Sequence, residues 1–310
     1  MGFRSPIAAG RLMRMSRTPY RPRNLQWSLF RGSLAVAEGY LTPTQLRSEA
    51  WIRLGRDIYA DARVDRDHHL RCRAARLWLP SEAAFAGPSA AALWDVPFAA
   101  EFGDPVHVLV PAKVRLRSRL GLAVHTTALL PGDIVDVGDL PRTTPVRTAW
   151  DLANWLPARD AVPIIDQLLR TDAVSEEALR DYVALRRGDR GWRLANHAVA
   201  LADAGAQSPP ESRLRVRLVE AGLPRPVTQY PIQLGRFTLR PDLAWPKYRV
   251  GMEYDGVWHE GRIDADRQRM NALKAAGWDI LHATKVHLGP QFSALLTQTQ
   301  TLLRIHGWPG

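Results

Sequence analysis

The chain has 310 residues, of which 46% are hydrophobic and 24% charged, a composition that is ordinary for a soluble globular protein. At about 150 residues per domain, this length predicts two domains. No apolar run approaches the roughly 18 residues of a membrane span, and the single cysteine, Cys72, excludes a disulfide framework and a cysteine-rich zinc site. The basic start lacks the apolar segment of a secretory signal, so we expect a cytoplasmic protein with no membrane partner.

The formal net charge of +11 is unevenly distributed along the chain. Residues 1–26 hold six arginines and no acid, residues 27–205 are balanced, and residues 206–310 hold 14 basic and 9 acidic side chains. Basic charge around a group of carboxylates suits a polyanionic substrate held near a metal ion. The alternative is that arginine has accumulated without a role, as in many GC-rich coding sequences. We expect residues 1–26 to form a basic, disordered tail.

Residues 27–80 have the pattern of a small winged helix-turn-helix. Ser33 and Thr42 can cap two short helices, Pro43 suits the first helical position of the second, and "RDIYADARV" alternates like a strand. The order helix, turn, helix, strand is typical of a DNA-binding module. The alternative is a small helical packing module that makes no contact with DNA.

Residues 81–205 predict a mixed α/β and helical region. A basic amphipathic helix is expected before it, at residues 66–80. The segments "DPVHVLVP" and "LAVHTTALL" alternate as strands. Five helices are expected, with Ser89 capping the first and Ser175 the fourth, in "PSAAALWDV", "TTPVRTAWDLANWLP", "ARDAVPIIDQLLR", "SEEALRDYVALRR" and "GWRLANHAVALADA". The segment "GAQSPP" then interrupts the periodicity and predicts a domain boundary.

Residues 206–310 predict a separate domain with the order α-β-β-β-α-β-α and a mixed sheet. Its strands are expected in "TQYPIQL", "RFTLRPDLAW", "YRVGMEYDG" and "WDILHAT", and its helices in "ESRLRVRLVEAGLP", "DADRQRMNALKAAG" and "PQFSALLTQTQTLLRIHG". The expected fold class is therefore α/β, or α+β when the chain is taken as a whole.

Three carboxylates interrupt the predicted hairpin of this domain. Glu253 and Asp255 point to one face of a strand because strand side chains alternate, and a turn near Pro246–Lys247 places Asp242 opposite or nearly opposite Glu253. Like charges opposed on a sheet repel each other. A divalent cation removes this conflict, since Mg²⁺ takes carboxylate oxygens as ligands.

A salt-bridge network is the alternative explanation of these acids. Arg240, Lys247 and Arg249 are near enough in the sequence to pair with them on an ordinary solvated hairpin. The apolar neighbours of Asp242 and Glu253 favour burial, and therefore a metal site, over this alternative.

The motifs "ESRLR", "RPDLAWP", "VGMEYDGVWHE" and "DRQRMNALKAAGWDILHAT" occur in an order that resembles the PD-(D/E)xK nuclease superfamily. They are most similar to the restriction-endonuclease-like family related to the very-short-patch-repair endonuclease, over about residues 209–303. The resemblance implies that Asp242 and Glu253 bind Mg²⁺ or Mn²⁺ and that Glu211, on the first core helix, completes the metal site. His259 matches a histidine that follows the acidic strand in the repair endonucleases.

One position departs from the pattern of that family. Asp255 stands where the superfamily has a lysine that positions or activates the attacking water. Lys274, on the following helix, or His259 could take over this work. The alternative is an inactive site that still binds DNA.

The expected DNA contacts lie on two helices of the C-terminal region. Arg213 and Arg217 belong to its first helix, and Arg267 and Asn271 share one face of the later helix with Lys274 at i, i+4, i+7 spacing.

The N-terminal half carries a second resemblance. The segments "AVAEGYLTPTQLRSEAWIRLGRDIYADARV" and "RCRAARLWLPSEAAFAGPSAAALWDV" are similar to the winged helix and adjoining domain of abortive-infection (type IV) antitoxins. That resemblance implies DNA binding and transcriptional autoregulation, with a toxin as a partner. A homodimer is a further expectation for the assembly.

Two functions follow from these patterns. The first is a metal-dependent DNA endonuclease that hydrolyses phosphodiester bonds in repair or defence, with Asp242, Glu253, Asp255, His259 and Lys274 as the catalytic residues. The second is a non-cleaving, DNA-binding regulator of the antitoxin kind. Both take DNA as the partner.

Overall fold

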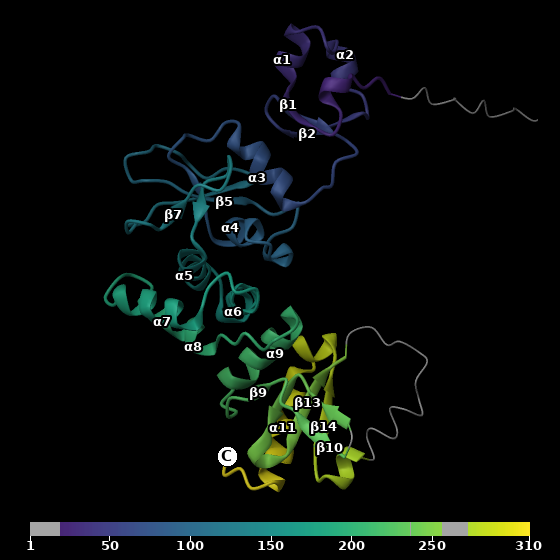
Figure 1. The fold of residues 1–310 in the computed structure, drawn as a ribbon, viewed down its shortest axis with the longest axis vertical. Coiled ribbons are helices and arrows are strands. Elements are labelled where there is room, and N and C mark those ends of the chain that lie inside the picture. Colours follow the sequence, from purple (N-terminus) through teal and green to yellow (C-terminus); the bar gives the residue numbers. More distant parts are fainter. Residues whose placement is uncertain (1–18, 236, 256–271) are drawn as a thin grey trace, which may run out of the picture. The chain divides into compact units, whose positions relative to one another are not determined.

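The structure, a computed structural model, describes residues 19–235, 237–255 and 272–310. It divides into two compact units. Unit 1 comprises the residues up to Arg66 together with Arg73–Trp78, and unit 2 comprises Asp67–Cys72 and Leu79–Gly310. Both units combine helices with strands (Figure 1), so the expected mixed α/β class is confirmed. Within the described ranges, every helix is too short or too polar to cross a bilayer.

Unit 1 is a three-stranded antiparallel sheet packed against two short helices. The strand order is β1-β3-β2, so the last strand lies between the first two. Trp51 and Ala35 belong to its small core, against which Phe30 and Tyr59 pack. The elements are η1 (Arg23–Leu25), β1 (Leu29–Arg31), α1 (Gly32–Ala37), α2 (Pro43–Leu46), β2 (Trp51–Gly55) and β3 (Ile58–Asp61).

Of the two predicted helix caps in unit 1, one is confirmed and one is wrong. Thr42 accepts from the backbone N–H of Gln45, whose side chain accepts in turn from Thr42, with Pro43 at the first helical position. Arg31, not Ser33, is the N-cap residue of α1. The Ser33 hydroxyl instead donates to Asp57 at 2.5 Å, which ties α1 to the β2–β3 turn.

The first part of unit 2 is a five-stranded mixed sheet with the order β6-β5-β4-β8-β7. Helix α3 (His68–Arg76) precedes this sheet in the chain, and its residues are divided between the two units. Ala86, not Ser89 as predicted, caps α4. The other elements are β4 (Ala84–Phe85), α4 (Gly87–Leu93), η2 (Pro97–Ala99), β5 (Val106–Leu109), β6 (Leu122–His125), β7 (Ile134–Val135) and β8 (Arg142–Thr143).

Four helices follow and form an extensive apolar core, to which Trp150, Ile165 and Leu168 belong. They are α5 (Pro145–Trp155), α6 (Ala158–Arg170), α7 (Glu176–Leu185) and α8 (Trp192–Leu201). The predicted cap Ser175 accepts from the N–H of Ala178 at 3.1 Å and is confirmed.

The helix α9 (Pro209–Glu220) packs directly on α6. Arg215 of α9 is fully buried and pairs with Asp166 of α6 at 2.6 Å. The boundary that the sequence predicts at 205–210 therefore falls inside unit 2, between helices that share a buried ion pair.

The C-terminal part of unit 2 is a four-stranded sheet with the order β14-β13-β12-β9 (Figure 1). The hairpin β12–β13 is antiparallel, and β13 and β14 are parallel. The elements after α9 are β9 (Val227–Thr228), β10 (Ile232–Leu234), β11 (Phe237–Leu239), β12 (Leu243–Trp245), η3 (Pro246–Tyr248), β13 (Val250–Tyr254), β14 (Asp279–Ala283), η4 (Lys285–Leu288) and α11 (Phe292–Ile305), and residues 272–275 are also helical.

Each face of this sheet has its own apolar cover. On one face, Leu243 and Met252 pack with Leu214 of α9 and Leu303 of α11. On the other face, Ala244 belongs to a cluster with residues of the β10–β11 hairpin and of the segment around 273–278, namely Ile232, Leu239, Leu273 and Trp278. This second face also holds the acidic side chains.

Candidate metal centre

The predicted hairpin register is confirmed. Leu243 pairs with Met252 and Trp245 with Val250, with η3 forming the turn at the predicted place. One step further along this register, Asp242 stands opposite Glu253. Because strand side chains alternate between faces, Asp242, Glu253 and Asp255 lie on the face away from the Leu243–Met252 core.

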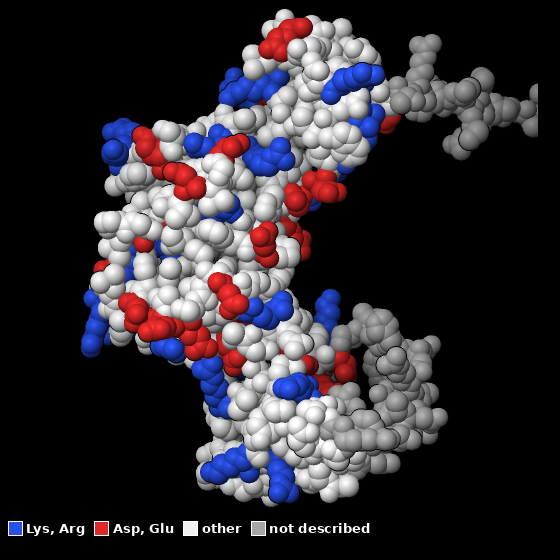
Figure 2. Space-filling model, viewed as in Figure 1, with Lys and Arg blue, Asp and Glu red and all other residues white. Residues whose placement is uncertain are grey.

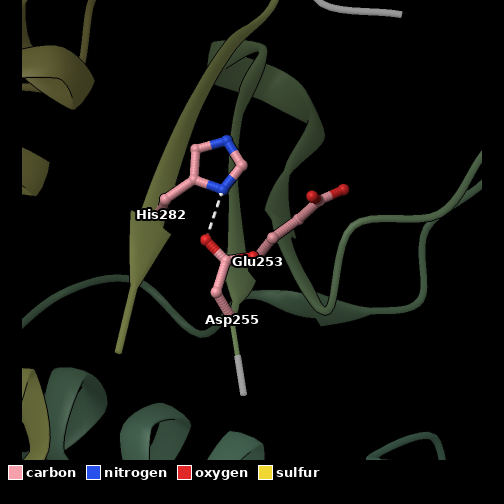
Figure 3. A group of neighbouring side chains, drawn as sticks. All are labelled: Glu253, Asp255 and His282. Atoms are coloured by element: carbon pink, nitrogen blue, oxygen red, sulfur yellow. Dashed lines mark hydrogen bonds and ion pairs between the residues drawn. The ribbon is translucent and has the colours of Figure 1, made fainter. Parts of the chain in front are cut away.

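The parallel strand β14 adds a histidine to this face. His282 is the register partner of Glu253. One possible ligand atom each from Glu253, Asp255 and His282 lies within 4.8 Å of the other two. Figure 3 shows the Asp255 carboxylate turned toward the imidazole, and Nδ1 of His282 lies 2.9 Å from Oδ2 of Asp255. This hydrogen bond leaves Nε2 of His282 as the ring nitrogen that faces away from Asp255.

Asp242 is held from two directions. Its Oδ1 accepts from the side-chain amide of Gln229 at 3.0 Å, and its Oδ2 accepts from the backbone N–H of Tyr254 at 2.7 Å. Gln229 has a φ of 51°, a left-handed conformation that is uncommon for glutamine.

Two of the three basic residues of the salt-bridge alternative have contacts with other groups. Arg240 donates to the backbone carbonyl of Gln229 at 3.4 Å, and the Lys247 ammonium lies 5.4 Å from the ring centroid of Tyr248.

Glu211 has a structural task at the start of α9. Its Oε1 accepts from the hydroxyl of Ser208 at 2.6 Å and its Oε2 from the backbone N–H of Gln207 at 2.9 Å. Burial raises the pKa of Glu211, the hydrogen bonds from Ser208 and Gln207 oppose this, and the charge of Asp242 raises the pKa further.

The structure places three of the predicted basic residues. Arg213 lies 3.7 Å from Asp160 of α6, and both side chains are partly exposed. Arg217 donates to the carbonyl of Leu288 at 2.6 Å, and its guanidinium carbon lies 3.7 Å from the ring centroid of Phe292, so it attaches α9 to η4 and α11. Lys274 is exposed on the helical segment that covers the acidic face of the sheet.

The other predicted residues, His259, Arg267 and Asn271, lie outside the described residues. Sequence reasoning missed His282 and Gln229, both of which contact a predicted acid. The one available signal for His282 was a polar residue in the apolar strand "WDILHAT".

The donor set suits a divalent cation. Carboxylate oxygens are the preferred ligands of Mg²⁺ and Mn²⁺, and an imidazole nitrogen adds affinity for Mn²⁺ and other transition metals. A side chain that donates a hydrogen bond to a ligating carboxylate, as Gln229 donates to Asp242, fixes the orientation of that carboxylate.

The chain matches no protein-family model. Two proteins of Mycobacterium tuberculosis, named Uncharacterized protein Rv2248 and Uncharacterized protein MT2308, are each 34% identical to it over 197 residues, which is 62% of this chain and 71% of each relative. The crystal structure of the RV2827C protein from the same species covers 56% of this chain and 71% of its own chain, with a TM-score of 0.39 and 17% identity. By its similarity to the first two proteins, the chain belongs to the same family as Rv2248 and MT2308.

Proposed function

We propose that this protein is a metal-dependent endonuclease that hydrolyses phosphodiester bonds in DNA, with Mg²⁺ or Mn²⁺ as its cofactor. The observation that carries the proposal is that Glu253, Asp255 and His282, in and next to the paired strands β13 and β14, each offer a possible ligand atom within 4.8 Å of the other two. A divalent cation bound by these side chains would offset the repulsion between the two carboxylates.

Each residue has a distinct task in this proposal. Glu253, Asp255 and His282 would hold the ion, with Asp242 beside them. Gln229 and the backbone N–H of Tyr254 keep the Asp242 carboxylate in one orientation. A bound divalent cation supplies Lewis-acid activation of water and stabilisation of charge on the phosphate oxygens.

One feature of the fold supports the proposal. The mixed sheet between α9 and α11 on one face and the β10–β11 hairpin on the other agrees with a restriction-endonuclease-like domain over residues 206–310. Unit 1 would be the DNA-binding module, with the β2–β3 hairpin as the wing. Its α2 has only four residues, which is short for a recognition helix.

The second candidate is a DNA-binding regulator that does not cleave. The observation that favours it is Asp255, which stands at the position of the catalytic lysine in the family that the C-terminal region resembles. In this candidate, Asp255 and His282 form a structural pair, and DNA binding needs no metal.

The test is a cleavage assay on supercoiled plasmid, mismatched duplex and single-stranded DNA with Mg²⁺, with Mn²⁺ and with EDTA. We expect wild type to cut one of these substrates only when metal is present. Glu253→Gln should lose cleavage, because an amide is a poorer ligand than a carboxylate for a hard cation. Glu177→Gln, which makes the same change at an exposed position of α7, should retain it.

DNA binding measured on the same proteins separates the two candidates. Binding without cleavage of any substrate under both metals would favour the regulator. Equal cleavage by wild type and Glu253→Gln would refute the assignment of Glu253 to a catalytic metal site.

A further inference from the structure

An exposed tryptophan in unit 1 is held in an unfavourable backbone conformation. Trp27 is 61% exposed, the largest exposed fraction of any tryptophan in the described part of the chain. Its φ of 56° lies in the left-handed region, which is strained for a bulky residue. Strained residues of this kind cluster at functional sites.

A buried carboxylate fixes this conformation. Asp61 is fully buried at the end of β3. Its Oδ2 accepts from the backbone N–H of Trp27 at 3.1 Å, and its own N–H donates to the carbonyl of Ser28 at 3.2 Å. Burial alone would raise the pKa of Asp61, but the hydrogen bonds from Arg63 and Trp27 lower it well below its usual value. The anchor is therefore ionised at neutral pH.

The same carboxylate places a cation on one face of the indole. Arg63 donates to Asp61 through both Nε and Nη2, the latter at 2.6 Å, and its guanidinium carbon lies 4.4 Å from the Trp27 ring centroid. Arg63 therefore lies over one face of an indole that is 61% exposed.

The surroundings of Trp27 are cationic toward solvent. Arg21 also pairs with Asp61, at 3.3 Å, and Arg23 in η1 is exposed. Asp61 is 0% exposed and the Arg21 side chain 16% exposed, whereas the Arg63 side chain is 38% exposed, so Arg63 is the most solvent-exposed of these three side chains. On the face drawn in Figure 2, Lys and Arg are interspersed with Asp and Glu. Net charge alone therefore does not mark a nucleic-acid surface.

We propose that Trp27, with Arg63, is a stacking site for an unpaired nucleobase of a single-stranded nucleic acid. The base would lie on the free face of the indole, opposite Arg63, and the neighbouring phosphates would contact the exposed guanidinium groups. Base stacking on aromatic side chains tolerates any sequence, and the guanidinium adds a cation–π contribution.

The geometry favours single strands over duplex DNA. Bases inside a duplex stack on each other and offer no free face, whereas an unpaired base does. DNA and RNA single strands share this chemistry, so both are included in the test. The inference concerns unit 1 and does not depend on the metal centre in unit 2.

The test measures binding of labelled oligo-dT, oligo-U and a blunt DNA duplex to the full chain by fluorescence anisotropy in EDTA. We expect wild type to bind the single strands more tightly than the duplex, and Trp27→Ala to weaken single-strand binding about 5-fold to 100-fold. Leu194→Ala, which truncates an apolar side chain of unit 2 that is 57% exposed, should leave binding unchanged. If Trp27→Ala weakens binding of oligo-dT more than binding of oligo-U, the bound strand is DNA, and the opposite result indicates RNA.

A second variant separates binding from folding. Trp27→Gly removes the ring and relieves the left-handed strain, so its melting temperature should equal or exceed that of wild type while single-strand binding is lost. Equal single-strand affinities of wild type, Trp27→Ala and Trp27→Gly would overturn the proposal. Weakened self-association with unchanged nucleic-acid affinity would also overturn it, because the ring would then contact a second copy. Because EDTA excludes metal, Glu253→Gln should bind as wild type does.

Discussion

At the scale of single residues, Asp242 shows how a carboxylate can be oriented before it binds a metal. Both of its oxygens already accept a hydrogen bond, one from a side-chain amide and one from the backbone. The amide of Gln229 can turn around and offer its oxygen instead of its nitrogen. An asparagine at position 242 could therefore keep both hydrogen bonds while losing the charge.

This geometry gives the first prediction. Asp242→Asn should leave the melting temperature without metal nearly unchanged, while the rise in melting temperature that Mn²⁺ causes in wild type should shrink or vanish. Thermal melts of both proteins with and without Mn²⁺ provide the measurement. A variant that melts well below wild type, together with a wild type that does not respond to metal, would support the salt-bridge interpretation.

A second residue-scale prediction concerns the pH dependence of stability. The His125 ring stacks on Trp155 with centroids 3.5 Å apart, and its Nε2 lies 3.1 Å from Nδ1 of His107. Burial, and to a lesser degree the nearby His107, lowers the pKa of His125 to about 4. The unfolded chain binds this proton near pH 6.5, so between pH 6.5 and 4 the unfolded state holds more protons, and stability falls as the pH falls.

The loss attributable to His125 should reach up to about 3 kcal/mol by pH 4. Denaturant unfolding at pH 7 and pH 4.5 measures it as a difference between variants. His125→Phe, which keeps a ring against Trp155, should flatten the pH dependence, whereas His197→Gln, at an exposed histidine, should not. Parallel pH profiles of wild type and His125→Phe would contradict the assignment.

At the scale of helices and strands, prediction from sequence succeeded where the determining contacts are local. Thr42 and Ser175 cap their helices through partners three residues away. Ser33 and Ser89 had the same local pattern, but their hydroxyls contact Asp57 and His68, which the fold brings from distant parts of the chain. No local pattern carries that information.

The same distinction applies to the site. The hairpin register that sets Asp242 opposite Glu253 follows from one tight turn and could be predicted. Glu253 and His282 are neighbours because β13 and β14 pair in parallel. A long connection separates these two strands in the chain, so the sequence did not indicate that the two residues lie side by side. The strained Gln229 was missed because a left-handed glutamine has no sequence signature.

The packing of α6 on α9 gives an element-scale prediction. Arg215 and Asp166 are buried and paired, whereas Arg213 and Asp160, on the same two helices, are about 40% exposed. Asp166→Asn should cost about 3–5 kcal/mol, because it leaves a buried guanidinium without its counter-charge. Asp160→Asn should cost less than about 1 kcal/mol. Urea unfolding of both variants gives the comparison, and equal costs would mean that the buried pair does not hold the helices together.

At the scale of the whole molecule, the basic N-terminus can be tested for a role in DNA binding. Residues 1–18 hold four arginines. A deletion should stop there, because Arg21 pairs with Asp61 and Leu25 belongs to the core of unit 1. If these arginines contact phosphates, the deletion should reduce the slope of log affinity against log salt by roughly 3–4. Anisotropy titrations from low to high salt measure the slope, and an unchanged slope would show that these residues do not contact DNA.

The central claim is that Glu253, Asp255 and His282 form a metal site, and calorimetric titration with Mn²⁺ tests it most directly. We predict one saturable binding event per chain in wild type and in Glu177→Gln, lost or strongly weakened in Glu253→Gln and His282→Ala. Each variant should melt within a few degrees of wild type without metal, since neither side chain is buried. An absence of Mn²⁺ binding by wild type, or equal binding by all four proteins, would contradict the metal site and the nuclease proposal built on it.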